Sequence, residues 1–331
     1  MNHRSNPLSS LQRLALGLRR VLAGGALLAL AGLSAAQGAK PVALQYGVIR
    51  GLTTSNLAKE SGALERRLAE AGTALVWRGP YSTTPFEALS AGQVDVTFTT
   101  STNASPAILG NAKFRIFAYQ APDLDGEGIW VKKDSGIKTL ADLKGRKIAT
   151  DKGGSGHHVL LKALDKAGIS PKDVKISHFD PADALAAFNG GQVEALASWR
   201  TFGASAEAKG NGVKLVSGRE VGSENLLIYI AREQFAAEHP EALKAVFEAL
   251  RESAAQSAKD PAATAVLWQK LGNLDAQTAP IFVPPASREV LPVTPAILPT
   301  LQSAAKLFVK YRVIPREPDF KPFILDVNKA P

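Results

Sequence analysis

The fold is decided by residues 148–164, where a short apolar run leads through a glycine-rich loop into an amphipathic helix. The stretch reads Ile148-Ala149-Thr150-Asp151-Lys152-Gly153-Gly154-Ser155-Gly156-His157-His158-Val159-Leu160-Leu161-Lys162-Ala163-Leu164. A strand followed by a helix is the repeating unit of α/β folds. The first amides of a helix lack partners within it, and Ser155 is placed to cap this one. We therefore expect an anion site at Ser155, Gly156 and His157, with an ordinary strand-to-helix turn as the alternative.

This loop does not match the known nucleotide-binding patterns. No Gly-Lys-Ser or Gly-Lys-Thr ends it, and its Gly-x-Gly lacks the third glycine of the dinucleotide motif. The adjacent His157 and His158 would diverge by about 100° on a helix, so they are poorly placed to chelate one metal ion. The sequence contains no His-Glu-x-x-His and no Gly-x-Ser-x-Gly. We predict no cofactor, no metal and no catalytic residue.

Residues 1–36 have the pattern of an export signal. An apolar run at residues 21–33 is preceded or abutted by Arg4, Arg13, Arg19 and Arg20 and followed by Ser34-Ala35-Ala36. The run is shorter than the roughly 20 residues that a membrane span requires. We therefore predict a cleaved signal peptide and a periplasmic or otherwise extracytoplasmic protein. An uncleaved N-terminal anchor is the alternative.

The charge and the cysteine count restrict the partners of the mature chain. Removal of residues 1–36 takes four of the 39 Lys and Arg and none of the 30 Asp and Glu, which leaves 35 against 30, a net charge of +5. This mild excess has no basic stripe interleaved with aromatic residues, so we expect no nucleic-acid partner. The chain has no cysteine, which excludes a cysteine nucleophile and leads us to expect no lipid anchor.

Strand and helix patterns alternate along most of the chain. Strands are predicted near residues 42–49, 74–77, 96–99, 114–119, 128–132, 174–178 and 195–198. One continuous helix is predicted from Asn56 to about Ala71, and helices follow residue 239. We expect the apolar run at residues 226–230 to pair with residues 129–131. This order predicts an α/β fold with mixed, mostly parallel sheets flanked by helices.

One helix–strand unit occurs twice. Residues 88–95 read Ala-Leu-Ser-Ala-Gly-Gln-Val-Asp, and residues 187–194 read Ala-Phe-Asn-Gly-Gly-Gln-Val-Glu. Each copy predicts a helix end, a glycine stop and a strand that opens into a polar or aromatic loop. Two lobes of similar topology are one interpretation, and chance similarity is the other. Because ligands sit at the carboxyl ends of strands in open α/β sheets, two such lobes would place these loops on opposite walls of a cleft.

The sequence resembles a known family, the periplasmic solute-binding proteins of ABC importers, over roughly residues 42–320. The run Lys132–Ala149, with Thr139-Leu140-Ala141-Asp142-Leu143-Lys144-Gly145 at its centre, is similar to the entry into the second lobe of those proteins. The sulfonate, nitrate and taurine branch is indicated by Lys152-Gly153-Gly154-Ser155-Gly156-His157, Phe179-Asp180-Pro181-Ala182-Asp183-Ala184, Gly191-Gln192-Val193-Glu194-Ala195, Trp199, Phe235-Ala236-Ala237-Glu238-His239-Pro240 and Val313-Ile314-Pro315.

The resemblance implies a type II, two-lobed α/β fold that closes by a hinge on a small anionic solute and delivers it to a membrane permease with its ATPase. It implies a first lobe at residues 37–126, a second lobe at 127–235 and a return to the first lobe, with C-terminal helices, at 236–331. We expect a monomer. The predicted ligand contacts are Thr54, Ser55, Ser101, Thr102, Asn103, Ser155, Gly156, His157, Trp199, Arg200, Glu224 and Asn225.

One departure from the family pattern affects the predicted solute. Where the family usually reads Trp-Asp-Pro-Phe, this chain reads Trp199-Arg200-Thr201-Phe202. An acid there would hold an ammonium group, whereas Arg200 would donate a bidentate pair to an oxyanion. We therefore expect a sulfonate or similar acid without a cationic end, unless Arg200 points to solvent. Trp199 is expected to form an apolar wall, with a core position as its alternative.

The sequence leaves two other functions open. An enzyme on the same two-lobed fold, such as a relative of the pyrimidine-precursor synthases, would require that family's cysteine-rich segment, and this chain has no cysteine. A receptor for a pyrimidine or thiamine precursor would require stacked aromatic residues in the cleft, for which Tyr81, Trp199 and Phe202 are the candidates.

Overall fold

The structure is a computed structural model that describes residues 42–121, 123–208, 212–274, 276, 279–283 and 289–329. The predicted export signal lies outside these residues. Apart from the first residue of its first strand, everything described below belongs to one compact unit, Ala43–Pro331. None of the helices described is long and apolar enough to cross a membrane.

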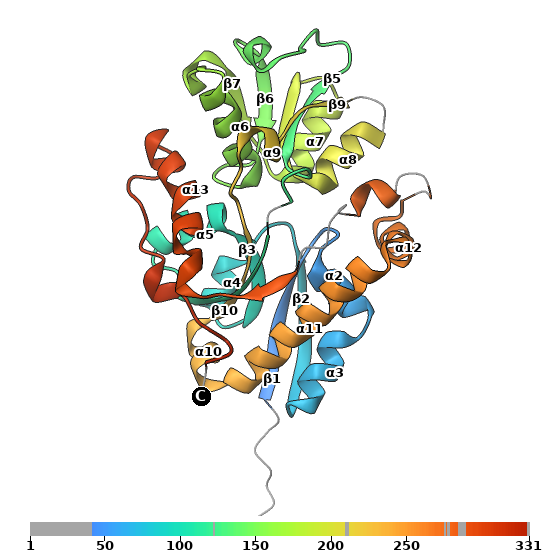
Figure 1. The fold of residues 1–331 in the computed structure, drawn as a ribbon, viewed down its shortest axis with the longest axis vertical. Coiled ribbons are helices and arrows are strands. Elements are labelled where there is room, and N and C mark those ends of the chain that lie inside the picture. The colour runs from blue at the N-terminus through green and yellow to red at the C-terminus, as the bar shows by residue number, and fades with distance from the viewer. Residues whose placement is uncertain are drawn as a thin grey trace, which may run out of the picture. The chain divides into compact units, whose positions relative to one another are not determined.

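Two mixed sheets form the centres of two lobes (Figure 1). The first sheet has the order β11-β4-β10-β3-β1-β2. Its strands are β1 (Val42–Ile49), β2 (Thr73–Tyr81), β3 (Val96–Thr100), β4 (Phe114–Gln120), β10 (Leu227–Arg232) and β11 (Val290–Pro292). The second sheet has the order β7-β6-β8-β5-β9. Its strands are β5 (Gly128–Lys132), β6 (Lys147–Thr150), β7 (Lys175–His178), β8 (Ala195–Ser198) and β9 (Gly212–Ser217).

The two sheets share one topology, as the sequence repeat predicts. Read from one edge, β4-β10-β3-β1-β2 corresponds to β9-β5-β8-β6-β7. In each lobe the repeated strand, β3 or β8, is parallel to one neighbour and antiparallel to the other. The glycine stops match as well, because Gly92 and Gly191 have φ values of 71° and 75°. Only glycine adopts this left-handed conformation without a steric penalty.

The predicted pairing of residues 226–230 with residues 129–131 is wrong. β10 lies between β3 and β4 of the first sheet and is antiparallel to both, whereas β5 lies between β8 and β9 of the second. Each lobe thus receives its antiparallel strand from a chain segment that has just crossed over. Because β10 belongs to the first sheet, we propose that the second lobe ends before Leu226 and not at residue 235. We keep the first crossing near residue 126 as part of this proposal.

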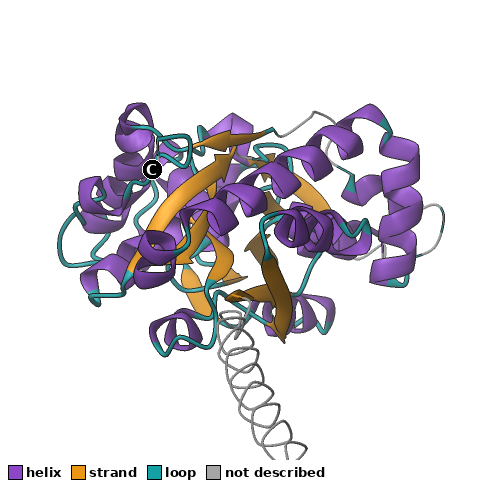
Figure 2. Ribbon diagram, turned by 90° about the horizontal axis from the view of Figure 1, so that it is seen from below, coloured by secondary structure: helices purple, strands orange, loops and turns teal. Residues whose placement is uncertain are grey.

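Helices surround the strands of both sheets (Figure 2). They are α2 (Thr54–Glu60), α3 (Ala63–Glu70), α4 (Phe86–Ser90), α5 (Ser101–Leu109), α6 (Ser155–Lys166), α7 (Pro181–Asn189), α8 (Arg200–Ala208), α9 (Gly218–Val221), α10 (Glu233–Glu238), α11 (Pro240–Lys259), α12 (Pro261–Gly272) and α13 (Leu298–Lys310). Short 3-10 turns occur at Leu140–Leu143, Pro171–Asp173, Ala279–Phe282, Pro295–Ile297 and Lys321–Phe323. The single helix predicted at residues 56–71 is two helices, because Gly62 takes a left-handed φ of 66° between them.

Each lobe has its own apolar core. Phe114, Ile228 and Phe308 are fully buried in the first, and Ile129 and Leu164 in the second. The helix α6 belongs to the second lobe, but its Leu161 packs into the core of the first, beside α13. The two lobes therefore contact each other through α6 and α13.

Candidate functional site

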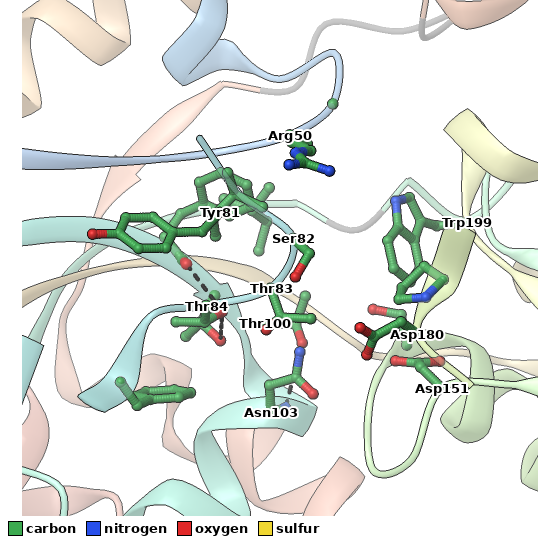
Figure 3. Close-up of a pocket in the computed structure, with 18 of the residues that line it drawn as sticks. Arg50, Tyr81, Ser82, Thr83, Thr84, Thr100, Asn103, Asp151, Asp180 and Trp199 are labelled. Carbon is green, nitrogen blue, oxygen red and sulfur yellow. Dashed lines mark hydrogen bonds between the residues drawn. The ribbon is translucent and has the colours of Figure 1, made fainter. Parts of the chain in front are cut away.

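A cleft of about 1730 Å³ lies between the lobes and is lined by loops that follow strands of both sheets. In the first lobe the lining loops follow β1, β2 and β3, and in the second they follow β6, β7 and β8. Figure 3 shows Arg50, Ser82, Thr83, Thr100 and Asn103 on one side, and Asp151, Asp180 and Trp199 on the other. This is the arrangement expected for ligand sites at the carboxyl ends of strands.

Arg50 is the distinctive group of the first wall. It directly follows β1, its side chain is exposed, and it lines the cleft. Among the described residues, its guanidinium has neither a hydrogen bond nor an ion pair, and only its backbone amide is bonded, to the carbonyl of Tyr81 at 2.8 Å. Ser82, Thr83 and Asn103 add hydroxyl and amide groups nearby (Figure 3). The first wall therefore offers a cation and several neutral donors to an anion.

The start of α6 differs from its prediction, because the amides expected to be unpaired have a partner. The N-cap is Gly154, and Ser155 is the first residue of the helix. The carboxylate of Asp151 accepts a hydrogen bond from the amide of His157 at 3.3 Å and another from the amide of Gly156. An internal anion thus occupies the helix start that we assigned to the ligand. Burial raises the pKa of the Asp151 carboxyl to about 6, against the effect of these hydrogen bonds.

Gly156 serves packing at this turn. A Cβ atom there would lie 2.3 Å from the carbonyl oxygen of Ala197 and 2.6 Å from the hydroxyl of Thr150. The glycine therefore lets α6 approach β8 closely, and it does not line the cleft.

Arg200 lines the cleft, but its charge is already paired. Its Nε and Nη2 donate to the two carboxylate oxygens of Asp123 at 2.5 and 2.6 Å, and Nη1 donates to the carbonyl of Ile281 at 3.3 Å. The two side chains are 17% and 15% exposed. This bidentate pair joins α8 of the second lobe to the crossing segment, so Arg200 is not a free cation for a ligand.

The cleft brings together five of the twelve predicted site residues. These are Asn103, Ser155, Trp199, Arg200 and Asn225. The other seven are not part of its lining: Thr54, Ser55, Ser101, Thr102, Gly156, His157 and Glu224.

Six of these seven residues have a functional side chain, and all six side chains are held by other parts of the protein. Thr54 donates to Gln120, and the hydroxyl of Ser55 is bonded to that of Tyr46. Nδ1 of His157 accepts from the amide of Gly153, and Glu224 pairs with Lys162. Ser101 and Thr102 donate to Asn225.

Sequence reasoning missed Arg50, the run Ser82-Thr83-Thr84, Asp151 and Asp180. Each follows the carboxyl end of a strand, as Asn103 and Trp199 do. Applying the same rule to β1, β2, β6 and β7 would have found them, but β2 was predicted to end at Trp77 and extends to Tyr81.

Burial disfavours the protonated form of the histidines beside the cleft. Burial lowers the pKa of His157 to about 4 and that of His158 to about 3, and burial also lowers the pKa of His178. Within the described part of the chain, no group of three or more His, Cys, Asp and Glu side chains could hold a metal ion.

Comparison with known proteins assigns the family. Residues 78–264 match the family model described as NMT1/THI5 like. The chain belongs to this family. A protein of Escherichia coli (strain K12) named for the binding of aliphatic sulfonates is 30% identical to it, over 92% of this chain and 94% of its own length.

Solved structures agree with this assignment. The alkanesulfonate-binding protein SsuA from Xanthomonas axonopodis pv. citri, solved with bound MOPS, has a TM-score of 0.80 at 26% identity and covers 87% of this chain and 99% of its own. The predicted two-lobed, type II periplasmic-binding-protein fold is confirmed. The desulfurization enzyme DSZB, at 16% identity and a TM-score of 0.66 over 87% of this chain and 98% of its own, shares the fold alone.

Proposed function

We propose that this NMT1/THI5-like protein is the extracytoplasmic substrate-binding component of an ABC importer and binds a small organic sulfonate in the cleft. The observation that carries the proposal is Arg50, a cation without a counter-ion among the described residues, set among hydroxyl and amide donors. The relatives support it, because one is named for aliphatic sulfonates and another holds MOPS, which is itself a sulfonate.

The chemistry of the first wall suits a sulfonate head. The three oxygens of a sulfonate share one negative charge and accept hydrogen bonds from several directions. A guanidinium presents a planar fork that matches two such oxygens, and Ser82, Thr83 and Asn103 would serve the rest. The head would therefore bind the first lobe and not the start of α6, where Asp151 already accepts the amides.

The second wall suits the remainder of the solute. Trp199 offers an apolar face, while Asp151 and Asp180 offer carboxylates that would repel an anion but attract an amino group. The pairing of Arg200 with Asp123 removes our reason for excluding a solute with a cationic end. Taurine and other aminosulfonates are therefore included among the proposed solutes.

Binding would proceed by closure of the two lobes. The cleft exceeds the roughly 300–1000 Å³ of ordinary ligand pockets, which fits an open form. A solute that contacts both walls only when they approach shifts the population towards the closed form. We propose that a permease, coupled to its ATPase, then recognises the closed monomer, and that the predicted signal peptide exports the protein to the periplasm without a lipid anchor.

We propose binding without catalysis. Within the described lining of the cleft, no Ser or Thr hydroxyl is hydrogen-bonded to a histidine, which is the usual way to activate such a nucleophile. Because an enzyme shares the fold, incubation with sulfonates and assay for released sulfite tests this proposal directly.

Calorimetry with ethanesulfonate, taurine, nitrate and a neutral pyrimidine tests the solute class. We expect one of the sulfonates to bind best. We also expect Arg50→Gln to weaken its binding by about 10- to 100-fold, as the loss of a charge-assisted hydrogen bond predicts. Arg78→Gln is the matched control, since this exposed arginine of the same lobe donates to Gln45 outside the cleft. Binding of the pyrimidine alone would reject the proposal in favour of the precursor receptor.

A further inference from the structure

Asn225 lies at the base of the cleft, where the two crossings of the chain meet. Residues 123–127 lead into the second lobe, and residues 222–226 lead back to the first. The two crossings are joined by a hydrogen bond from the hydroxyl of Ser223 to the carboxylate of Glu127 at 2.7 Å. The helix α9, which precedes the return crossing, adds backbone hydrogen bonds from the amide of Gly218 to the carbonyl of Glu127 at 2.8 Å and from the amide of Arg219 to the carbonyl of Leu124 at 3.0 Å. Asn225 is 2% exposed, although it reaches the lining of the cleft.

The side-chain amide of Asn225 has all of its polar groups engaged. Its Nδ2 donates to the hydroxyl of Ser155 and to the carboxylate of Glu127, both at 2.7 Å. Its Oδ1 accepts from the hydroxyl of Ser101 at 3.1 Å and from the backbone amide of Thr102 at 3.4 Å. The carboxylate can only accept and the backbone amide can only donate, so these two partners fix the orientation of the side chain.

These bonds tie together two helix starts that belong to different lobes. Ser101 and Thr102 begin α5 of the first lobe, and Ser155 begins α6 of the second. Both helices start at the cleft, and α13 packs against both of them. A contact at the crossings lies close to the axis about which the lobes would rotate, so its distances change least during closure.

We propose that Asn225 is a positioning residue that acts as the pivot of lobe closure. It holds the first turns of α5 and α6 at a fixed separation, so that the lobes rotate about the crossings and do not separate or slide. This inference goes beyond the proposed function, because it concerns the protein without solute. Its consequence for binding is indirect: a looser pivot lowers the fraction of molecules that can close, and the apparent affinity falls with that fraction.

The distance between the lobes can be measured directly, because the chain has no cysteine of its own. Lys113 and Lys133 are exposed residues of the first and second lobes, and Lys113→Cys with Lys133→Cys gives one dye site on each. Single-molecule energy transfer without solute should show a narrow distance distribution. We expect Asn225→Ala to broaden this distribution and to weaken ethanesulfonate binding by about tenfold.

Two controls separate a pivot from general loss of structure. Asn56→Ala removes an amide that accepts from Thr53 within the first lobe, and it should leave the distribution narrow. Asn225→Asp sets a second carboxylate against Glu127 and should broaden the distribution. Adding Glu127→Gln exchanges donor and acceptor, restores that hydrogen bond and should narrow the distribution again.

The outcomes that overturn the proposal are distinct. An unchanged distribution in Asn225→Ala rejects the pivot, and weaker binding with an unchanged distribution makes Asn225 only a ligand contact. If Asn225→Ala does not fold, Asn225→Asp and its double variant with Glu127→Gln test the proposal instead. A distance distribution that is as broad in the double variant as in Asn225→Asp alone rejects the pivot. The distribution is recorded without solute, so a failure of sulfonate binding would not affect it.

Discussion

Arg200 of α8 holds Asp123 of the first crossing segment in a bidentate ion pair, with donor–acceptor distances of 2.5 and 2.6 Å. The pair lies at the edge of the cleft, and both side chains are largely buried. It neutralises an arginine that the sequence presents as a ligand contact.

We predict that Arg200→Ala affects stability more than binding. The loss of the guanidinium leaves a largely buried carboxylate without its cation, which should reduce the free energy of unfolding by about 1–3 kcal/mol. Affinity for ethanesulfonate should stay within about threefold of the parent. Urea unfolding and calorimetry measure the two effects. Adding Asp123→Ala should recover part of the stability, and a loss of affinity as large as that of Arg50→Gln would contradict the assignment.

Titration of the Asp151 carboxyl should make the affinity for a sulfonate depend on pH. Burial raises the pKa of its carboxyl to about 6, so the group is charged at pH 7.5 and neutral at pH 5. The charged form repels an anion in the cleft, so affinity for ethanesulfonate should rise several-fold as the pH falls across this range. Burial lowers the pKa of His157 to about 4, so this histidine stays neutral over most of this range. Calorimetry in matched buffers measures the affinity for ethanesulfonate at each pH and tests this dependence.

Asp151→Asn is the control for this pH dependence, because it preserves the shape of the side chain and removes its charge. The variant should bind ethanesulfonate at pH 7.5 about as well as the parent does at pH 5. Taurine should show a flatter profile, since its ammonium group gains from the carboxylate that its sulfonate opposes. An equally steep profile in Asp151→Asn would assign the titration to another group.

The absence of a side chain at Gly203 lets α8, the helix that carries Arg200, pack closely against the ring of Trp130. A Cβ atom at this position would lie 2.0 Å from the ring of Trp130, whose Nε1 donates to Glu207 of the same helix at 2.7 Å. Gly203→Ala must displace α8 and should reduce the free energy of unfolding by about 1–3 kcal/mol. Gly110→Ala is the matched control, because its Cβ would meet its nearest atoms at 3.4 and 3.5 Å. Equal unfolding midpoints for the two variants would refute the constraint.

Because Trp199 lines the cleft, solute binding should change the tryptophan fluorescence of the protein. Of the four tryptophans, Trp199 lines the cleft, while Trp130 and Trp268 are only 1% and 3% exposed and Trp77 lies outside the lining. Addition of the best sulfonate should therefore change the emission mainly through Trp199. Trp199→Phe should remove most of the change while calorimetry still detects binding. A full signal in that variant would place the responsive tryptophan elsewhere.

Local patterns were sufficient for much of the fold. The repeat at residues 88–95 and 187–194 predicts two lobes of one topology, and Gly92 and Gly191 end their helices as expected. The rule that ligands meet the carboxyl ends of strands correctly places Asn103 and Trp199 in the cleft. The break at Gly62 was missed because the apolar spacing of a helix continues through it.

The sequence by itself determined the α/β class, the repeated unit and the cleft loops that follow β3 and β8, because backbone preference and apolar periodicity are local properties. Only the tertiary structure decided which polar groups were already occupied. Arg200 and its partner Asp123 are 77 residues apart, and Asn225 is 124 residues from Ser101. Such pairs form where the folded backbone brings distant segments together and excludes water, and a periodic pattern contains no information about that distance.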